Sequence, residues 1–230
     1  MIRTILPICD RNLWALKPFS YLHNVFWSEE QSVLVIGFKA PDFEIPKNFS
    51  FHSIGPVDPG PQYWSDQLIE GLSNVEDEHL IVMLEDYWIN RGVDHRGVAT
   101  LHEYCDHHPE VLRMDLTADR LYAGGMFEVD HYGCYDIVET RKETPYQMSL
   151  QAAIWNRTKL LSVLRPGLTP WEVETVLSNE VKEHYRILGS RQWPTRYANV
   201  FNSANPGMVM NLEQIPDEHV KYMRGQGWIK

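Results

Sequence analysis

Short apolar runs recur along the first hundred residues, and polar side chains hardly interrupt most of them. A run this short and rich in Ile and Val is typical of a strand that is buried on both faces. The run at 80–84 is the clearest case, because five apolar residues pass directly into Glu85 and Asp86. The pattern predicts four strands in this part of the chain, at residues 4–10, 32–38, 49–55 and 80–84.

Stretches of helical periodicity separate these strands. Residues 14–27 carry apolar side chains at three- and four-residue steps, and we expect a helix that begins after Pro18; residues 63–75 predict another. Strands joined by long crossovers form parallel sheets wound with helices. With no repeat, low-complexity tract or linker in sight, the whole chain, 1–230, is predicted to form one α/β domain.

The strongest helix signal lies in the second half of the chain, at residues 169–189. Thr169 is suited to the N-cap, Pro170 to the first position and Glu172 to a capping box, and Gly189 is the expected terminator. Residues 95–116 are predicted to carry a helix followed by a strand near 111–116.

Two adjacent carboxylates, Glu85 and Asp86, follow the strand at 80–84. Ligands of parallel α/β sheets lie beyond the carboxyl ends of the strands, so these acids are expected at the mouth of a cleft. Such a pair suits Mg²⁺ or Mn²⁺. These ions take oxygen ligands, and a diphosphate commonly supplies part of their coordination shell. The alternative is two solvated acids where a strand meets a loop.

The segment Leu168–Glu174 offers acids in the first turn of the predicted helix. One of Glu172 and Glu174 is expected to serve the capping box, while the other acts as a general base on an acceptor hydroxyl. Trp171 offers a flat apolar face to a ring.

Several other patterns are interpreted as structural. The histidines at 102, 107 and 108 are predicted to lie in a solvated loop, not in a metal site. No phosphate-binding P-loop, dinucleotide fingerprint or nucleophile elbow occurs.

Composition and charge narrow the class of protein. With 43% hydrophobic and 23% charged residues, the chain is typical of a folded globular protein. No apolar run approaches the roughly 20 residues of a membrane span, and no signal peptide is evident, so a cytoplasmic location is expected. The net charge of −10 hides an asymmetry, since residues 1–140 hold 9 basic against 23 acidic residues and 141–230 hold 12 against 8.

A basic and aromatic cluster lies in this more basic part of the chain. Arginines between aromatic rings can follow a phosphate backbone and stack bases, although the same pattern occurs in plain surface loops. The candidate contacts to DNA are Arg186, Arg191, Trp193, Arg196 and Tyr197.

Several of these segments together resemble small GT-A-like glycosyltransferases of bacteriophages and bacterial surface-polysaccharide loci. The resemblance is carried by Asp10 after the first strand, by "YWSDQLI" and "LEDYW", and by the segment from Tyr146 to Glu174. It spans about Thr4 to Glu174, and it implies a GT-A-like, Rossmann-like, mostly parallel central sheet flanked by helices. Side-by-side Glu85 and Asp86 depart from the commoner D-x-D form of such enzymes, which leaves the metal requirement open.

The resemblance also implies roles for individual residues. Residues 1–100 would bind a nucleotide-sugar, with its diphosphate held through a metal at Glu85 and Asp86, and residues 101–230 would bind the acceptor. The catalytic residues would be Asp86 and Glu172. The remaining contacts would be divided among the nucleoside (Asp10, Arg11), the donor pocket (Trp64, Ser65, Asp66), the sugar side (Gln151, Trp155) and the acceptor side (Trp171).

We therefore expect a glycosyltransferase that uses a nucleotide-diphosphate sugar, preferably a UDP-sugar. The favoured acceptor is 5-hydroxymethylcytosine or a related hydroxymethylpyrimidine in phage DNA, whose base must leave the stack to reach a pocket. The alternatives are a surface-polysaccharide acceptor, a non-catalytic nucleotide-sugar-binding module, and a nucleotidyl- or phosphoryltransferase that uses the same acids.

Overall fold

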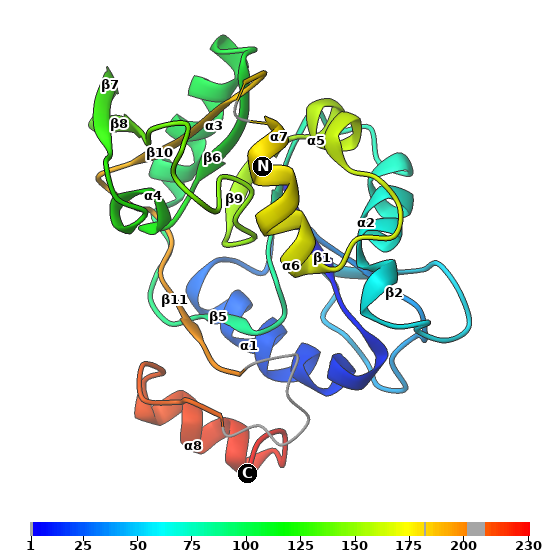
Figure 1. Cartoon of the computed structure of the whole chain (residues 1–230). Coiled ribbons are helices and arrows are strands. Elements are labelled where there is room, and N and C mark those ends of the chain that lie inside the picture. Colours follow the sequence, from blue (N-terminus) through cyan, green and yellow to red (C-terminus); the bar gives the residue numbers. More distant parts are fainter. Residues whose placement is uncertain (1, 182, 202–209) are drawn as a thin grey trace.

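A nine-stranded sheet in the order β3-β2-β1-β4-β9-β6-β10-β8-β7 forms the centre of the computed structural model, which describes residues 2–181, 183–201 and 210–230 (Figure 1). Strands β3, β2, β1 and β4 are parallel neighbours, as are β6 and β10. Strand β9 pairs antiparallel with both β4 and β6, so these two blocks run in the same direction. Only β8 and β9 oppose the other seven strands. The mixed, mostly parallel α/β sheet predicted from the sequence is confirmed.

The strands of the large sheet are short. They span Arg3–Pro7 (β1), Val33–Gly37 (β2), Phe49–Ser53 (β3), His79–Val82 (β4), Val111–Asp115 (β6), Phe127–Tyr132 (β7), Tyr135–Glu139 (β8), Ala153–Asn156 (β9) and Arg186–Ser190 (β10). A separate two-stranded antiparallel sheet pairs β5 (Tyr87–Ile89) with β11 (Tyr197–Asn199).

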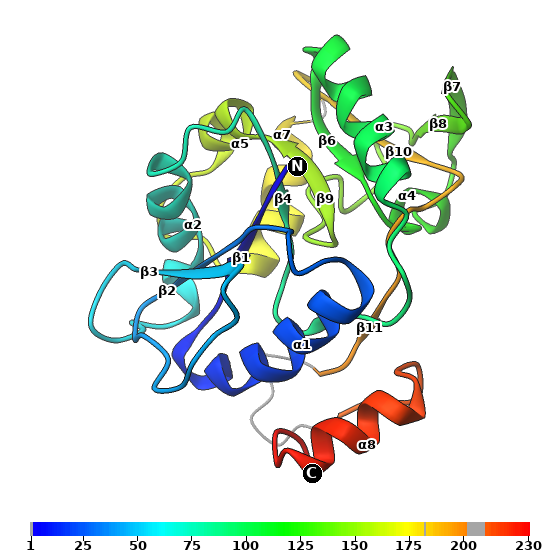
Figure 2. The same cartoon turned by 180° about the vertical axis from the view of Figure 1, so that it is seen from behind.

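Helices cover both faces of the sheet (Figures 1 and 2). The α-helices span Leu16–Phe26 (α1), Trp64–Ser73 (α2), His95–His107 (α3), Asp119–Tyr122 (α4), Arg157–Val163 (α5), Pro170–Glu172 (α6), Ser178–Val181 (α7) and Asp217–Gly225 (α8). Two 3-10 helices, η1 (Asp10–Ala15) and η2 (Pro61–Tyr63), and a π-helical stretch, η3 (Val173–Leu177), complete the described elements.

Strand β4 shows why the run at 80–84 is wholly apolar. Successive side chains of a strand point to opposite faces. Leu80 and Val82 pack into the cluster that contains α2, α5 and η3, whereas Ile81 and Met83 pack into the cluster that contains α1 and α3. All four side chains are at most 1% exposed, and burial of such a side chain contributes about 1.5–3 kcal/mol.

Helix α1 begins earlier than the sequence pattern indicates. It starts at Leu16 and includes Pro18 in its first turn. A proline is tolerated there because the first backbone N–H groups of a helix have no partner within it. Helix α8 packs on α1, where the rings of Tyr21 and Tyr222 stack with centroids 4.6 Å apart and the Tyr21 hydroxyl lies 2.9 Å from His219 Nδ1 (Figure 2).

The single long helix predicted at 169–189 is wrong. Helical structure runs through α6, η3 and α7 and ends at Val181; Lys182 lies outside the described residues. Gly189, the expected terminator, instead lies in strand β10. A Cβ atom at Gly189 would lie 2.7 Å from Cγ of Arg120, so close packing against that side chain requires the glycine.

The helix predicted within residues 95–116 is confirmed, but the solvated loop predicted around its histidines is wrong. His102 and His107 lie on α3, and His108 is its C-cap. Asp94 caps the start of this helix by accepting a hydrogen bond from the Gly97 N–H at 3.0 Å. Val98, Leu101, Tyr104 and Cys105 give the helix a buried apolar face.

Within the part of the chain that the structure describes, no helix combines the length and the apolar character that crossing a bilayer would require.

Candidate functional site

A cavity of about 560 Å³ lies beyond the carboxyl ends of β1 and β4, at the edge where ligands of parallel sheets are expected. Six of the residues proposed from the sequence line it: Asp10, Arg11, Trp64, Glu85, Asp86 and Trp171. Glu174, Tyr87, Asp58 and Asn199 complete much of its polar wall. The structure therefore brings the two acids that follow β4 together with the residues that follow β1.

Asp10 organises one wall of this cavity. Its two carboxylate oxygens accept hydrogen bonds from the backbone N–H groups of Lys39 and Asp58, each at 2.9 Å. These partners belong to the segments that follow β2 and β3. Asp10 thus ties three strand ends together, and its neighbour Arg11 supplies a guanidinium group to the same cavity.

Glu85 is buried in the floor of the site. Asn12 of η1 donates a hydrogen bond to its Oε1 at 2.6 Å, and the indole N–H of Trp88 donates to its backbone oxygen at 2.9 Å. Burial raises the pKa of the Glu85 carboxyl, while the Asn12 hydrogen bond and the Arg11 charge act in the opposite direction.

Asp86 is a second carboxylate of the cavity whose pKa is strongly raised. Burial, together with the neighbouring Glu85 and then Glu174, raises its pKa to about 8, against the effect of a backbone hydrogen bond. Its Oδ1 is buried and has no hydrogen-bond partner in the part of the chain that the structure describes. Its backbone is fixed, because its carbonyl oxygen accepts a hydrogen bond from the Val200 N–H at 2.9 Å, beside the β5–β11 pair.

The two acids of the Leu168–Glu174 segment have different tasks. Glu172 completes the capping box: its Oε2 accepts from the Thr169 N–H at 2.8 Å, and its own N–H donates to Thr169 Oγ1 at 3.2 Å. The same contacts lower the pKa of this exposed carboxyl, which does not line the cavity.

Glu174 is the acid that faces the cavity. Burial raises the pKa of its carboxyl, although its Oε1 accepts the Leu150 N–H at 2.8 Å. Glu172 was chosen from the sequence as the catalytic member of this pair, but the capping box occupies it, and Glu174 is the acid that lines the cavity. The Thr-x-x-Glu spacing was the signal that distinguishes the two.

Two tryptophans stand on the cavity wall. Trp64 begins α2, and Trp171 on α6 is 46% exposed although it is a large apolar side chain. A partly exposed indole at a cavity rim is suited to stacking on a planar or apolar ligand face.

Four other residues proposed from the sequence lie outside the cavity lining. Ser65 Oγ accepts the Leu168 N–H and Asp66 Oδ2 accepts the Gly167 N–H, both at 2.8 Å, so this pair holds the loop before α6. Gln151 donates to Asp119 Oδ1 at 3.0 Å, and Trp155 lies in the core at 1% exposure.

A buried charge network next to the cavity was not anticipated from the sequence. Arg113 and Arg120 both contact Asp115, and Arg120 Nη2 also donates to Asp119 at 2.8 Å. A second hollow of about 370 Å³ is lined by Asp119, Arg120, Gln151 and Glu174 among others, so Glu174 borders both hollows. The available signal was the charged pair in the apolar strand VLRMD.

The basic and aromatic cluster is largely engaged within the protein. Arg186 pairs with Glu139 at 2.9 Å and Arg191 with Glu128 at 3.3 Å. The Arg196 guanidinium lies 4.1 Å above the ring of Trp193. Tyr197 on β11 donates its hydroxyl hydrogen bond to Gln151 Oε1.

Cation ligands converge elsewhere in the molecule. Among the residues that the structure describes, one group of three His, Cys, Asp or Glu side chains can hold a metal ion, and it is His79, His102 and Asp106. Glu85 and Asp86 do not form such a group with a third side chain of the described ranges, so a cation there would need oxygen atoms from a bound ligand.

The free thiol of Cys9 lines the cavity, where burial raises its pKa to about 11 and keeps it protonated.

Comparisons with known proteins bear on the fold. No protein-family model and no curated protein matches this sequence. Among solved structures, a UDP-glucose pyrophosphorylase from Acinetobacter baumannii is similar, with a TM-score of 0.51 and 11% identity over 86% of this chain and 88% of that one. TarS 1–349 from S. aureus has a TM-score of 0.48 and 16% identity over 85% of this chain and 59% of that one. The first likeness, together with the sheet described above, shows that the chain has a GT-A-like, mostly parallel α/β fold.

Proposed function

We propose that the chain is a glycosyltransferase that moves a sugar from a nucleotide-diphosphate sugar, preferably a UDP-sugar, to an acceptor hydroxyl in the 560 Å³ cavity. The observation that carries this proposal is Asp86, whose buried Oδ1 has no partner among the described residues and whose neighbours are two further carboxylates. A buried acid of this kind is costly unless a cation or a proton compensates it. The arrangement is well suited to a ligand that arrives with both a cation and a hydrogen-bonding sugar.

The donor would be held at the ends of β1 and β4. Arg11 compensates negative charge on the diphosphate, and Trp64 offers a flat face to the base or the sugar. Asp86, with Glu85 behind it, would hold Mg²⁺ or Mn²⁺ together with phosphate oxygens, and such an ion neutralises charge on the leaving group. The orphaned oxygen of Asp86 fits this role, whereas Oε1 of Glu85 is already bonded to Asn12.

Glu174 is the proposed general base, in place of Glu172. As the acceptor oxygen bonds to the anomeric carbon, the bond from that carbon to the diphosphate breaks, and Glu174 takes the hydroxyl proton. A carboxylate with a raised pKa is a better base near neutral pH than an exposed one. Trp171 on the same helical segment would contact the acceptor.

The cavity lining supports the division into a donor half, residues 1–100, and an acceptor half, residues 101–230. Its walls come from residues 7–87 on the proposed donor side and from 150–199 on the proposed acceptor side.

The acceptor expected from the sequence is a hydroxymethylpyrimidine in DNA. Binding of a DNA backbone requires cationic contacts. Arg186 and Arg191 would have to exchange their partners Glu139 and Glu128 for phosphates to provide them. This pairing favours the alternative acceptor, a surface glycan, over DNA.

The test is a product analysis with the full chain, a panel of UDP-sugars, Mn²⁺, and two acceptors: hydroxymethylcytosine-containing DNA and a lipopolysaccharide-type glycan. Glycosyl transfer predicts a hexose-sized or pentose-sized mass gain on one acceptor and release of the nucleoside diphosphate. Asp86→Asn should abolish this gain, while Glu172→Gln should keep it. Release of pyrophosphate would instead indicate nucleotidyl transfer, the activity named for the Acinetobacter protein. Donor binding without any product would leave a binding module and refute the proposal.

A further inference from the structure

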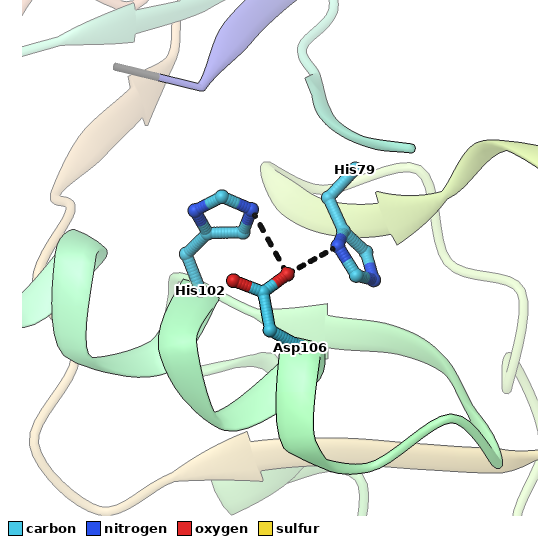
Figure 3. A group of neighbouring side chains, drawn as sticks. All are labelled: His79, His102 and Asp106. Carbon is cyan, nitrogen blue, oxygen red and sulfur yellow. Dashed lines mark ion pairs between the residues drawn. The ribbon is translucent and has the colours of Figure 1, made fainter. Parts of the chain in front are cut away.

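A second cluster of ligand-type side chains lies at the opposite end of β4 from the proposed donor site. His79 is the first residue of β4, and His102 and Asp106 lie one helical turn apart on α3 (Figure 3). Both imidazole rings point toward the Asp106 carboxylate (Figure 3). Asp86, in the donor cavity, follows β4 beyond its other end, so the two sites are separate.

The distances within this cluster lie on either side of those between ligands of a small tetrahedral ion. His79 Nδ1 lies 3.0 Å and His102 Nε2 lies 3.6 Å from the same oxygen of Asp106. Zinc binds His nitrogen and carboxylate oxygen at about 2.0–2.2 Å, which places two ligands of a tetrahedron about 3.3–3.5 Å apart. All three ligand atoms lie within 4.8 Å of one another, so small side-chain movements suffice to surround one ion.

The surroundings favour a cation. The cluster borders a hollow of about 620 Å³ that is also lined by Glu78, Glu103 and Asp77. Asp77 is paired with Arg3 at 3.1 Å, but the other acids add negative charge near the two histidines. Two imidazoles with one carboxylate select zinc over Mg²⁺, which prefers an all-oxygen shell.

One ligand of the cluster is buried and two are partly exposed, so a metal ion can enter from solvent. The His79 side chain is only 4% exposed, and Asn156 Nδ2 lies 3.5 Å from the far nitrogen of its ring. His102 and Asp106 are 32% and 50% exposed, on the open side. The buried ligand is therefore held in place, while the two outer ligands are accessible.

From this geometry we propose that His79, His102 and Asp106 bind one Zn²⁺, with water in the fourth position. The ion links the start of β4 to α3, and it stabilises the sheet at the edge away from the donor cavity. This proposal is independent of the glycosyltransferase proposal, since none of its residues lines that cavity.

The experiment uses the full chain without a histidine tag, stripped with a chelator and then dialysed against Zn²⁺. We expect one bound zinc per chain by elemental analysis and a higher melting temperature for the loaded protein. Substitution of Co²⁺ should give the visible absorption of a tetrahedral nitrogen and oxygen site.

Two variants at the exposed ligands test the assignment without disturbing the core. His102→Ala and Asp106→Asn should each weaken zinc binding at least tenfold. The matched control is His107→Ala, because His107 lies on the same helix, is exposed, and contacts Tyr132 at 3.2 Å instead of the cluster. Asp86→Asn should leave the zinc content unchanged, which separates this site from the donor cavity. No stoichiometric zinc in the unmutated chain, or unchanged affinity in His102→Ala, would overturn the proposal and leave ion pairs between the two histidines and Asp106.

Discussion

Replacement of Asp86 by Asn should make the protein more stable at neutral pH while it removes transfer activity. Burial and the adjacent carboxylates raise the pKa of Asp86 from an ordinary 3.8 to about 8. A carboxyl whose pKa is raised by folding contributes its full stability below pH 3.8, and that contribution is lost as the pH rises toward about 8. Asn has nearly the same shape and carries no charge, so the variant does not lose this stability as the pH rises.

The magnitude follows from the interval between the two pKa values. Each pH unit in that interval lowers the free energy of unfolding by about 1.36 kcal/mol for one group. From pH 3.8 to pH 7 the loss amounts to about 4 kcal/mol. Asp86→Asn should therefore match the unmutated chain near pH 4 and exceed it by about 4 kcal/mol at pH 7.

The assay is urea denaturation across this pH range, followed by the fluorescence of the eight tryptophans. Asp42→Asn, at an exposed position, is the matched control and should leave the pH dependence unchanged. The reasoning fails if the stability difference between Asp86→Asn and the unmutated chain stays constant from pH 5 to pH 8.

Substitutions at three further places test the roles of Glu174, Arg120 and Gly71. In a steady-state assay, Glu174→Gln should lower turnover by about 10²–10⁴-fold with little effect on donor binding. Glu172→Gln keeps the capping box and should leave turnover within about twofold in the same assay. Arg120→Met should lower the free energy of unfolding in urea by about 3 kcal/mol, because the buried Asp115 loses one of its two cationic partners; an unchanged midpoint would contradict this. Gly71→Ala should lower the melting temperature, since the new Cβ would meet a β2 side chain at 2.0 Å, while Gly92→Ala, with open space around it, should not.

The sequence predicts the strands β1, β2 and β4 well because they are buried on both faces. At 80–84 no polar residue alternates with the apolar ones, and the structure explains this by two separate hydrophobic clusters that share β4. The acids after this strand were expected at the ligand-binding edge, and the cavity lies there.

Residue roles were harder to predict where two local signals compete. Glu172 and Glu174 both fall in the first turns of a helical segment, and only the completed capping box shows which one is left free. A glycine such as Gly189 is typical of the residue after a helix. In the structure, however, a glycine is needed there because the side chain of Arg120, from a distant segment, packs against it. The charge network of Arg113, Asp115 and Arg120 joins β6 to α4, and its signal in the sequence is the charged pair within the otherwise apolar strand β6.

The reversed strand β9 has a consequence for synthesis of the chain. It is the only connection in the sheet between β4 and β6, and its pairing joins His79 with Asn156, far apart in the sequence. Until Asn156 has left the ribosome, both neighbouring strands present unpaired backbone groups along an apolar edge, the kind of surface that promotes aggregation. Translation of the first 150 residues is therefore the stage at which a chaperone would protect this protein most, and truncation before β9 should yield insoluble material.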